Sequence, residues 1–206
     1  MKLAVNIWKE TLRVLKRHPK ILIPFLVVGT AHFLLIYLIY SAPQRPLSSV
    51  FAPPIRAFFG EKFLHYPFNF FVFPQLFNYG EIILSALVGI FMTALAIGMI
   101  ADVIQKQETS LLVNSLKSIR RYCALFGVWI LMFLFVRLTM SIFHRIVPAG
   151  EGLRTLIASS LYFLGAIFIQ LLFIYAIPLI IIKKKKLLAA LRENTAVLKK
   201  LFFPTM

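Results

Sequence analysis

Four runs of predominantly apolar residues constrain this chain more than any other feature of its sequence. They cover approximately residues 21–40, 82–104, 122–143 and 156–182. At a rise of about 1.5 Å per residue, each run is long enough to cross a bilayer's hydrocarbon core, which is about 30 Å thick. Lipid offers no partners to backbone N–H and C=O groups, so each spanning segment must be a helix. The sequence therefore predicts an all-α, polytopic helical membrane protein with about four transmembrane helices.

The composition agrees with residence in a membrane. Hydrophobic residues make up 60% of the chain and charged residues only 15%. In a soluble domain about a quarter of the residues are charged, and its core does not need four apolar runs of 20 residues or more. We therefore predict that residues 1–206 form a single membrane domain.

Lysine and arginine collect in alternate segments between the apolar runs. Residues 1–20, 105–121 and 183–206 carry six, four and seven of them, whereas residues 41–81 and 144–155 carry three and two. Basic residues are enriched in cytoplasmic loops. The bias predicts a multi-pass protein of the inner, cytoplasmic membrane with both termini in the cytoplasm.

A block of four lysines follows the fourth apolar run directly. Such a block has two interpretations, a grip on nucleic acid or a charged anchor at the edge of a bilayer. Nucleic-acid binding would call for aromatic stacking or groove-reading elements in a soluble module, and the sequence contains none. We expect the lysines to lie among anionic headgroups, where each basic residue gains about 1 kcal/mol, and we expect no nucleic-acid partner.

The segment after the lysines repeats the N-terminal one. Residues 8–17 (WKETLRVLKR) align with residues 191–200 (LRENTAVLKK), so that Glu10 falls on Glu193. A weaker copy covers residues 114–121 (NSLKSIRR). All three copies stand in segments that the charge bias places on the cytoplasmic side.

Each copy has the period of an amphipathic helix. The apolar positions are Val5, Trp8, Leu12 and Leu15 in the first copy, and Leu188, Leu191, Leu198 and Phe202 in the last. Such a helix lies flat at the interface, with its basic side chains among headgroups. Docking on a cytoplasmic partner is the alternative. The residues predicted to contact interfacial lipid are Trp8, Lys9, Arg13, Lys16, Arg17, Lys183, Lys184, Lys185, Lys186, Lys199 and Lys200.

This pattern predicts a repeated unit of flat helix, outward span, outer loop and inward span. The first unit covers residues 1–104, the second covers residues 105–182, and an incomplete third covers residues 183–206. Parallel repeats of this kind occur in membrane folds. The sequence leaves open whether the chain is a shortened form of a six-span protein.

Two quoted segments carry a resemblance to a known group. NIWKETLRVLKRHPKILIPFL and the later IYAIPLIIIKKKKLLAALRENTAVLKKLFF resemble a broad group of prokaryotic multi-span membrane proteins of unknown function. The membrane domain attached to some glycerophosphodiester phosphodiesterases is similar. Tyr175 and Pro178 match that group's "Y-x-x-P", and Asn194 stands where a serine is usual. The resemblance implies six spans and no catalytic site, because the phosphodiesterase chemistry belongs to a separate soluble domain.

Polar residues inside spans are costly and mark sites of interest. His32 lies in the first span, Asp102 in the second, Arg137 in the third and Gln170 in the fourth. One interpretation is hydrogen bonding between neighbouring helices, with Arg137 reaching toward the outer edge. The other is a polar path for transport.

Small residues recur along the second span. Ser85, Gly89 and Thr93 form one stripe, and Gly98 and Asp102 belong to another. Small side chains let helices approach closely. We predict that this span packs against two neighbours, in the same chain or in another.

The first outer loop is too apolar for a solvated loop. Residues 51–77 contain nine phenylalanines, and prolines at 53, 54, 67 and 74 are expected to break any long helix. An interfacial or re-entrant cap is predicted. Its role as a lid, a docking surface or a seal stays open.

No catalytic or metal-binding motif is recognisable in the sequence. We therefore expect no enzyme, no metal and no cofactor. The predicted role is that of an interaction, scaffold or membrane-homeostasis protein, with the bilayer's anionic headgroups, a membrane-protein partner or a second copy as partners. The alternative is a transporter or permease subunit with a polar path that includes His32, Arg137 and Gln170.

Overall fold

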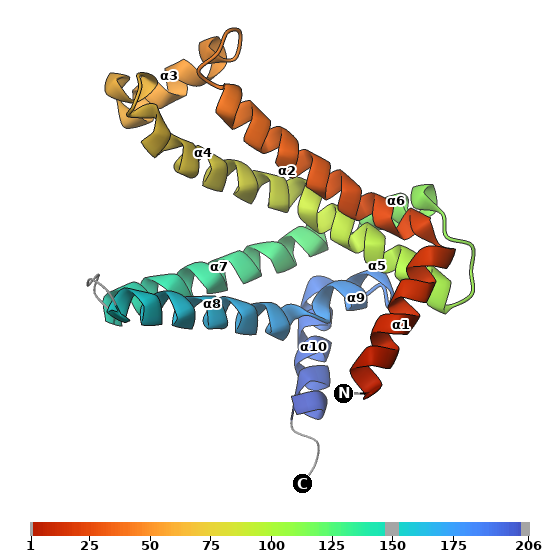
Figure 1. The fold of residues 1–206 in the computed structure, drawn as a ribbon. Coiled ribbons are helices and arrows are strands. Elements are labelled where there is room, and N and C mark those ends of the chain that lie inside the picture. Colours follow the sequence, from red (N-terminus) through yellow and green to blue (C-terminus); the bar gives the residue numbers. More distant parts are fainter. Residues whose placement is uncertain (1, 147–152, 203–206) are drawn as a thin grey trace. The chain divides into compact units, whose positions relative to one another are not determined.

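A computed structural model describes residues 2–146 and 153–202. Within these residues the ordered segments are helical and no strand occurs (Figure 1). Four of the described helices are long and apolar enough to cross a membrane: Pro19–Ser41, Asn69–Ile104, Tyr122–Ile142 and Ser160–Ile181. The protein is therefore an all-α, multi-pass membrane protein, as predicted. The side chains of Lys200 and Phe202 lie outside the described residues.

The chain divides into two compact units, residues 1–93 and residues 94–206. This division rests on packing and differs from the predicted repeat at 1–104, 105–182 and 183–206, which stays a prediction. Each unit is described by itself.

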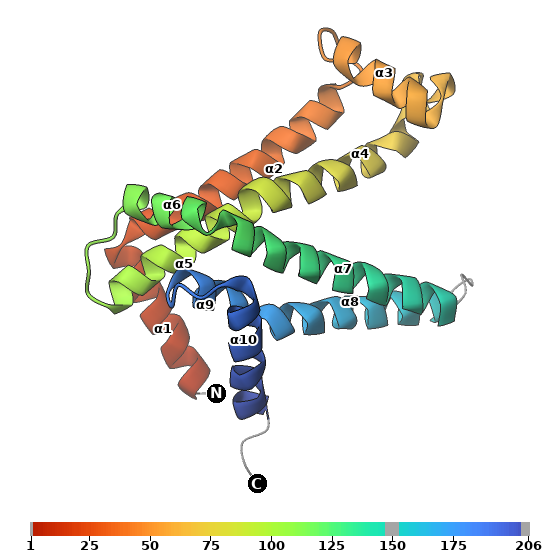
Figure 2. The same ribbon diagram turned by 180° about the vertical axis from the view of Figure 1, so that it is seen from behind.

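Unit 1 is a pair of long helices with a helical cap. Its elements are α1 (Lys2–Arg17), η1 (Pro19–Leu22), α2 (Ile23–Ser41), α3 (Ser48–Phe59), η2 (Glu61–Leu64), α4 (Asn69–Leu84) and the π-helical turn η3 (Ser85–Gly89). Helices α2 and α4 lie side by side in both views (Figures 1 and 2). Val72 of α4 and Ile39 of α2 are buried. A Cβ on Gly80 of α4 would lie 2.6 Å from the side chain of Leu35, so these helices approach closely there.

The second span begins earlier than the sequence predicts. Its helix begins at Asn69 rather than near residue 82, and it continues through Pro74 and the η3 turn to Ile104. The expectation that Pro74 breaks a long helix was therefore wrong. A proline removes one backbone hydrogen bond, but in apolar surroundings the remaining backbone groups still require the helix, so the helix continues.

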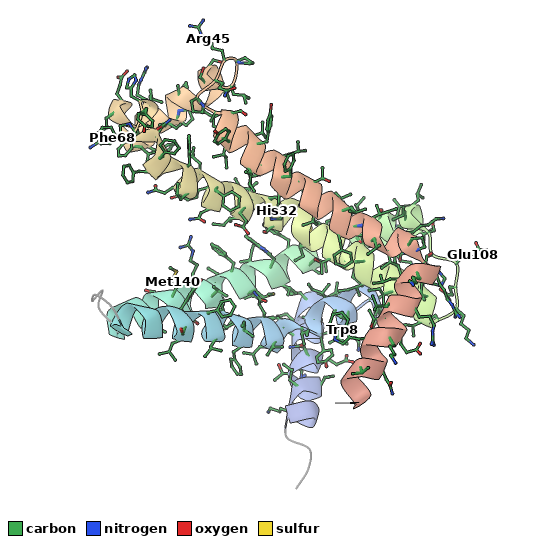
Figure 3. The ribbon with its side chains drawn as sticks, in the orientation of Figure 1. Trp8, His32, Arg45, Phe68, Glu108 and Met140 are labelled. Atoms are coloured by element: carbon green, nitrogen blue, oxygen red, sulfur yellow. The ribbon has the colours of Figure 1, made fainter. Side chains whose placement is uncertain are left out.

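The phenylalanine-rich loop is itself largely helical. It forms α3, η2 and the first turns of α4, and Gly60 makes the turn between α3 and η2 at a φ of 96°, where a side chain would be strained. Figure 3 shows Arg45 in the α2–α3 connection and Phe68 at the start of α4. Phe58 remains 83% exposed. The segment is therefore helical, and its position as an interfacial or re-entrant cap stays a prediction.

Unit 2 contains most of α5 (Ile90–Ile104), then α6 (Leu111–Arg120), α7 (Tyr122–Ile146), α8 (Leu153–Phe173), α9 (Ala176–Ile181) and α10 (Leu187–Phe202). Helices α7 and α8 run side by side in opposite directions in both views (Figures 1 and 2). Helix α10 packs on α8 and α9. The buried side chains Leu125, Val128, Ile180 and Ala190 belong to the core of this unit.

Residues 156–182 were expected to form one continuous helix, but the fourth span is interrupted. Helix α8 ends at Phe173 and α9 begins at Ala176. Pro178 explains the position of this break, because its ring displaces the carbonyl four residues earlier and it has no N–H to donate. The three predicted amphipathic segments, in contrast, are helices as expected: α1, α6 and α10.

Candidate functional site

A buried polar cluster joins α5 to α6. The Asp102 side chain on α5 is buried, and Asn114 on α6 is fully buried. Asn114 Nδ2 donates to Asp102 Oδ2 at 2.5 Å, and Lys117 Nζ donates to Asp102 Oδ1 at 3.4 Å. A buried carboxylate must be paired and hydrogen-bonded to be tolerated. Asp102 meets that requirement with an amide and an ammonium from one helix.

Local sequence explains why α6 presents these groups. Ser110 caps the helix by accepting from the N–H of Val113, the usual role of serine at this position. Asn114 and Lys117 then lie on one face because they are three residues apart. Asn114 uses its whole amide: Nδ2 also donates to the Ser110 carbonyl at 3.0 Å, and Oδ1 accepts from Lys117 at 3.3 Å.

Gly98 makes room for Asn114. A Cβ at this position would lie 2.7 Å from Asn114 Oδ1, closer than real Cβ contacts allow. The predicted close approach at Gly98 therefore has a definite neighbour, the amide of α6. Asp102 lies one helical turn further along the same face of α5.

Helix α6 buries polar side chains and exposes apolar ones together with Lys117 and Arg120. Asn114 and Ser118 are buried, while Leu112 and Ile119 are 69% and 60% exposed. In a helix on a soluble protein the two faces are reversed. An exposed face that combines apolar and basic side chains is typical of a helix at the boundary between an apolar medium and water.

A cavity of about 730 Å³ opens beside the cluster, between α5, α6 and the α9–α10 connection. Four basic residues line it: Lys117, Arg120 and Arg121 from the α6 segment, and Lys184 from the connection. Asp102 is the only carboxylate among its lining residues, and Glu108, in the α5–α6 connection (Figure 3), does not line it. The cavity is therefore strongly basic.

The four lysines after α9 have different environments. Lys183 Nζ lies 2.5 Å from Glu193 Oε1, and Lys185 Nζ lies 3.3 Å from Glu193 Oε2. The hydrogen bond from Lys183, and then that from Lys185, lowers the pKa of the Glu193 carboxyl below its ordinary value of 4.5. Lys184 has a φ of 54° and lines the cavity, and Lys186 is exposed. Among the described residues, only Lys184 and Lys186 of this block are without an ion-pair partner.

Asn194 of α10 closes the break between α8 and α9. Its side chain is buried, its Oδ1 accepts from the N–H of Tyr175 at 3.1 Å, and its Nδ2 donates to the Leu172 carbonyl. These are backbone groups that a helix interruption leaves without intrahelical partners. One amide therefore satisfies both sides of the break and fixes α10 against it.

The predicted polar candidates of the spans lie in separate environments. His32 Nδ1 donates to the Val28 carbonyl of its own helix at 2.8 Å. Arg137 is exposed and its guanidinium lies 5.3 Å from the ring centre of Phe133. Gln170 is exposed on α8. Only Asp102 belongs to the polar cluster described above.

The first small-residue stripe has contacts within its own helix. Thr93 Oγ1 donates to the Gly89 carbonyl at 2.8 Å, and a Cβ on Gly89 would lie nearest to Ser85 and Leu84. Ser85 and Gly89 bound the π-helical turn. Packing of this stripe on a neighbouring helix stays a prediction.

Helix α1 leaves its apolar face open within unit 1. Trp8 is 68% exposed on this helix (Figure 3), and the apolar side chains of Val5 and Leu12 are also exposed. The basic residues predicted to contact lipid, Lys9, Arg13, Lys16 and Arg17, are exposed as well. Of these, Arg13 pairs with Glu10 at 2.6 Å.

The buried face of α10 differs from the predicted apolar face. Ala190, Asn194 and Leu198 form its buried face, whereas Leu188, expected to share a face with Leu198, is 79% exposed. Lys199 is exposed. The tertiary contacts of unit 2 therefore select a buried face that centres on the asparagine.

Sequence reasoning missed the central residues of the site. It counted Lys117, Arg120 and Arg121 only as positive charge, and it gave Asn114 no role. The available signal was an asparagine within the period of an amphipathic helix, followed three residues later by a lysine. Such a residue has to find a polar partner if the helix packs on its side.

In the part of the chain that the structure describes, no group of three or more His, Cys, Asp or Glu side chains is arranged to hold a metal ion. No protein-family model, curated protein or solved structure matches the chain. The resemblance drawn from the two quoted segments therefore stays a proposal.

Proposed function

We propose that this protein is a non-catalytic component of the inner, cytoplasmic membrane, an interaction, scaffold or membrane-homeostasis protein whose cytoplasmic face associates with anionic lipid. The observation that carries the proposal is the inverted polarity of α6. It buries Asn114 and Ser118 and exposes Leu112 and Ile119 beside the basic cavity. Apolar side chains next to lysine and arginine suit the boundary between acyl chains and anionic headgroups.

The charge bias of the sequence supports the orientation in this proposal. Segments 1–20, 105–121 and 183–206, which contain α1, α6 and α10, carry most of the basic residues. Under the positive-inside rule these segments and both termini lie in the cytoplasm. The chain's resemblance to the group of prokaryotic multi-span membrane proteins also agrees with this arrangement.

Thiol labelling tests the orientation. In a Cys123→Ser background, Ser49→Cys should react with a membrane-impermeant reagent in intact cells, and Lys199→Cys should react only after the membrane is opened. Both native side chains are exposed. Labelling of Lys199→Cys in intact cells would contradict the proposed topology.

Fluorescence quenching tests the lipid contact of α1. With Trp129→Phe, Trp8 is the remaining tryptophan. Shallow brominated lipid should quench its emission strongly and aqueous iodide only weakly, because an interfacial helix places its apolar face in the acyl region. Strong quenching by iodide would favour a solvated helix, or one that binds a cytoplasmic partner.

The transporter alternative requires a wet path past the polar residues of the spans. His32→Cys, Gln170→Cys and Arg137→Cys, each in the Cys123→Ser background, would then react with a small water-soluble thiol reagent. Under our proposal His32→Cys and Gln170→Cys stay unreactive, because their spans face lipid or other helices. Reaction at both positions would replace the scaffold assignment with a conduit.

A further inference from the structure

The basic cavity of unit 2 has more positive charge than its own carboxylate can neutralise. Asp102 is already paired with Lys117 and hydrogen-bonded by Asn114. In the described part of unit 2, the remaining ion pairs join Lys183 and Lys185 to Glu193, and none involves Arg120, Arg121 or Lys184. Three cations therefore line one cavity without an anionic partner among the described residues.

The cavity also has an apolar wall. Ile181 and Ile182 at the end of α9 and Leu116 of α6 line it together with the cations. Its volume of about 730 Å³ lies within the range of about 300–1,000 Å³ that is usual for sites of small organic ligands. A bare inorganic ion would leave most of that volume and the whole apolar wall unused.

We propose that this cavity binds the phosphate of an anionic phospholipid, with the phosphate between Arg120, Arg121 and Lys184 and the lipid body against Ile181, Ile182 and Leu116. The inference rests on the proposed function in one respect, that this end of unit 2 lies at a lipid interface. Guanidinium groups match phosphate oxygens with paired N–H donors, and such charge-assisted bonds are among the stronger ones in proteins.

The buried cluster gives this site a fixed frame. Asn114 and Lys117 tie α6 to Asp102, and Arg120 follows Lys117 by three residues on the same helix. On the other side of the cavity, the backbone at Lys184 is held because its neighbours Lys183 and Lys185 are bound to Glu193. The backbone that carries the three cations is thus positioned before the ligand arrives, which lowers the entropic cost of binding.

Photocrosslinking on the unmodified protein tests the location. The full chain is placed in nanodiscs that contain photoreactive phosphatidylglycerol, and crosslinked peptides are identified by mass spectrometry. Crosslinks should concentrate in residues 111–121 and 181–187. Crosslinks confined to other segments would overturn the assignment, and this result does not depend on whether any variant folds.

A pair of matched variants tests the chemistry. R120Q/R121Q/K184Q removes the three cations of the cavity, and R45Q/R56Q/K62Q removes two arginines and a lysine that are exposed in unit 1. Phosphatidylglycerol retention by the cavity variant should fall about tenfold or more, and that of the control by less than about twofold, because only the cavity gathers its donors on one phosphate. Equal losses of lipid retention in the two variants would show that general surface charge holds the lipid, and would overturn the site.

Two further arms identify the ligand. R120K/R121K keeps the charge and loses the paired guanidinium donors, so retention should fall by an intermediate amount, about threefold. Phosphatidylcholine should bind weakly, since its ammonium group opposes the cations. If glycerol 3-phosphate or inorganic phosphate prevents the crosslink from forming, the cavity binds soluble phosphate. That result would overturn its assignment to lipid.

The outcomes separate this site from the proposed function. Nanodiscs expose both leaflets, so binding in the cavity is measured whatever the orientation in cells. Loss of the crosslink with correct thiol labelling would reject the phosphate site alone. A reversed labelling pattern with intact crosslinks would reject the cytoplasmic assignment and leave the site.

Discussion

Helices α6 and α10 both attach to the rest of unit 2 through a buried asparagine, but the two side chains satisfy different needs. Asn114 of α6 binds a carboxylate, whereas Asn194 of α10 binds the backbone at a helix break. Before each helix the chain turns through a lysine with positive φ, Lys106 at 55° and Lys184 at 54°. The two connections are alike in form and differ in what holds them.

The difference lies in the apolar support. Helix α10 also buries Ala190 and Leu198, while the fully buried side chains of α6 are Asn114 and Ser118, both polar. Burial of a methylene contributes about 0.8 kcal/mol without regard to direction, whereas a hydrogen bond depends on geometry and on both partners. Helix α6 should therefore depend more strongly on single polar residues than α10 does.

The largest effect is expected from Asn114→Ala. The substitution leaves the Asp102 carboxylate buried without its amide donor, which should cost about 2–3 kcal/mol because hydrogen bonds to charged groups are strong. Amide hydrogen exchange in residues 111–120 should accelerate, and the thermal midpoint should fall. Ser115→Ala, on the same helix, is the control. Equal effects of the two substitutions would show that α6 is held by something other than this cluster.

Asn194→Ala should have a smaller effect, about 1–2 kcal/mol, because the apolar contacts of α10 remain while two backbone groups lose their partner. The N–H of Tyr175 should exchange faster in this variant. Asn194→Ser should fall between the two, since one hydroxyl can serve only one side of the break at a time. An Asn194→Ala loss larger than that of Asn114→Ala would reverse the proposed ranking of the two helices.

Gly98→Ala sharpens the comparison from the side of α5. The new Cβ would lie 2.7 Å from Asn114 Oδ1, so α6 must shift, at a cost of about 1 kcal/mol or more from overpacking. Gly29→Ala on α2 is the control, because nothing lies within 4 Å of its Cβ. That variant should gain about 0.5–1 kcal/mol from helix propensity. The thermal midpoint should therefore fall in Gly98→Ala and rise in Gly29→Ala.

The smallest effect should come from the pH dependence of α10. The pKa of Glu193 is lowered by Lys183 and Lys185, so its contribution is full above the ordinary value of 4.5 and is lost as the pH falls through the lowered pKa. Protease protection of residues 183–199 should decrease below pH 4.5 and should decrease less in Glu193→Gln. An identical acid profile in both proteins would show that the lysines are held without this carboxylate.

The residue pattern predicted the class of the protein and most of its helices. Runs of apolar residues become helices in lipid whatever else they contact, since only a helix satisfies their backbone groups. The amphipathic period of α1, α6 and α10 is visible within each segment, so these helices are also predictable from the sequence. Pro178 is also visible in the sequence as the cause of the break in the fourth span, because a proline removes a helical hydrogen bond.

Tertiary structure alone decided where the helix of the second span begins, which face of α10 is buried, and the candidate site. The cavity collects Arg120, Arg121 and Lys184 from segments more than sixty residues apart, and Asp102 meets Asn114 only because Gly98 lets the helices approach. Spacing along one segment determines which face a side chain occupies, but not which partner that face meets. Partners are chosen by the packing of whole helices, and in this protein the buried amides of Asn114 and Asn194 mark where that packing places α6 and α10.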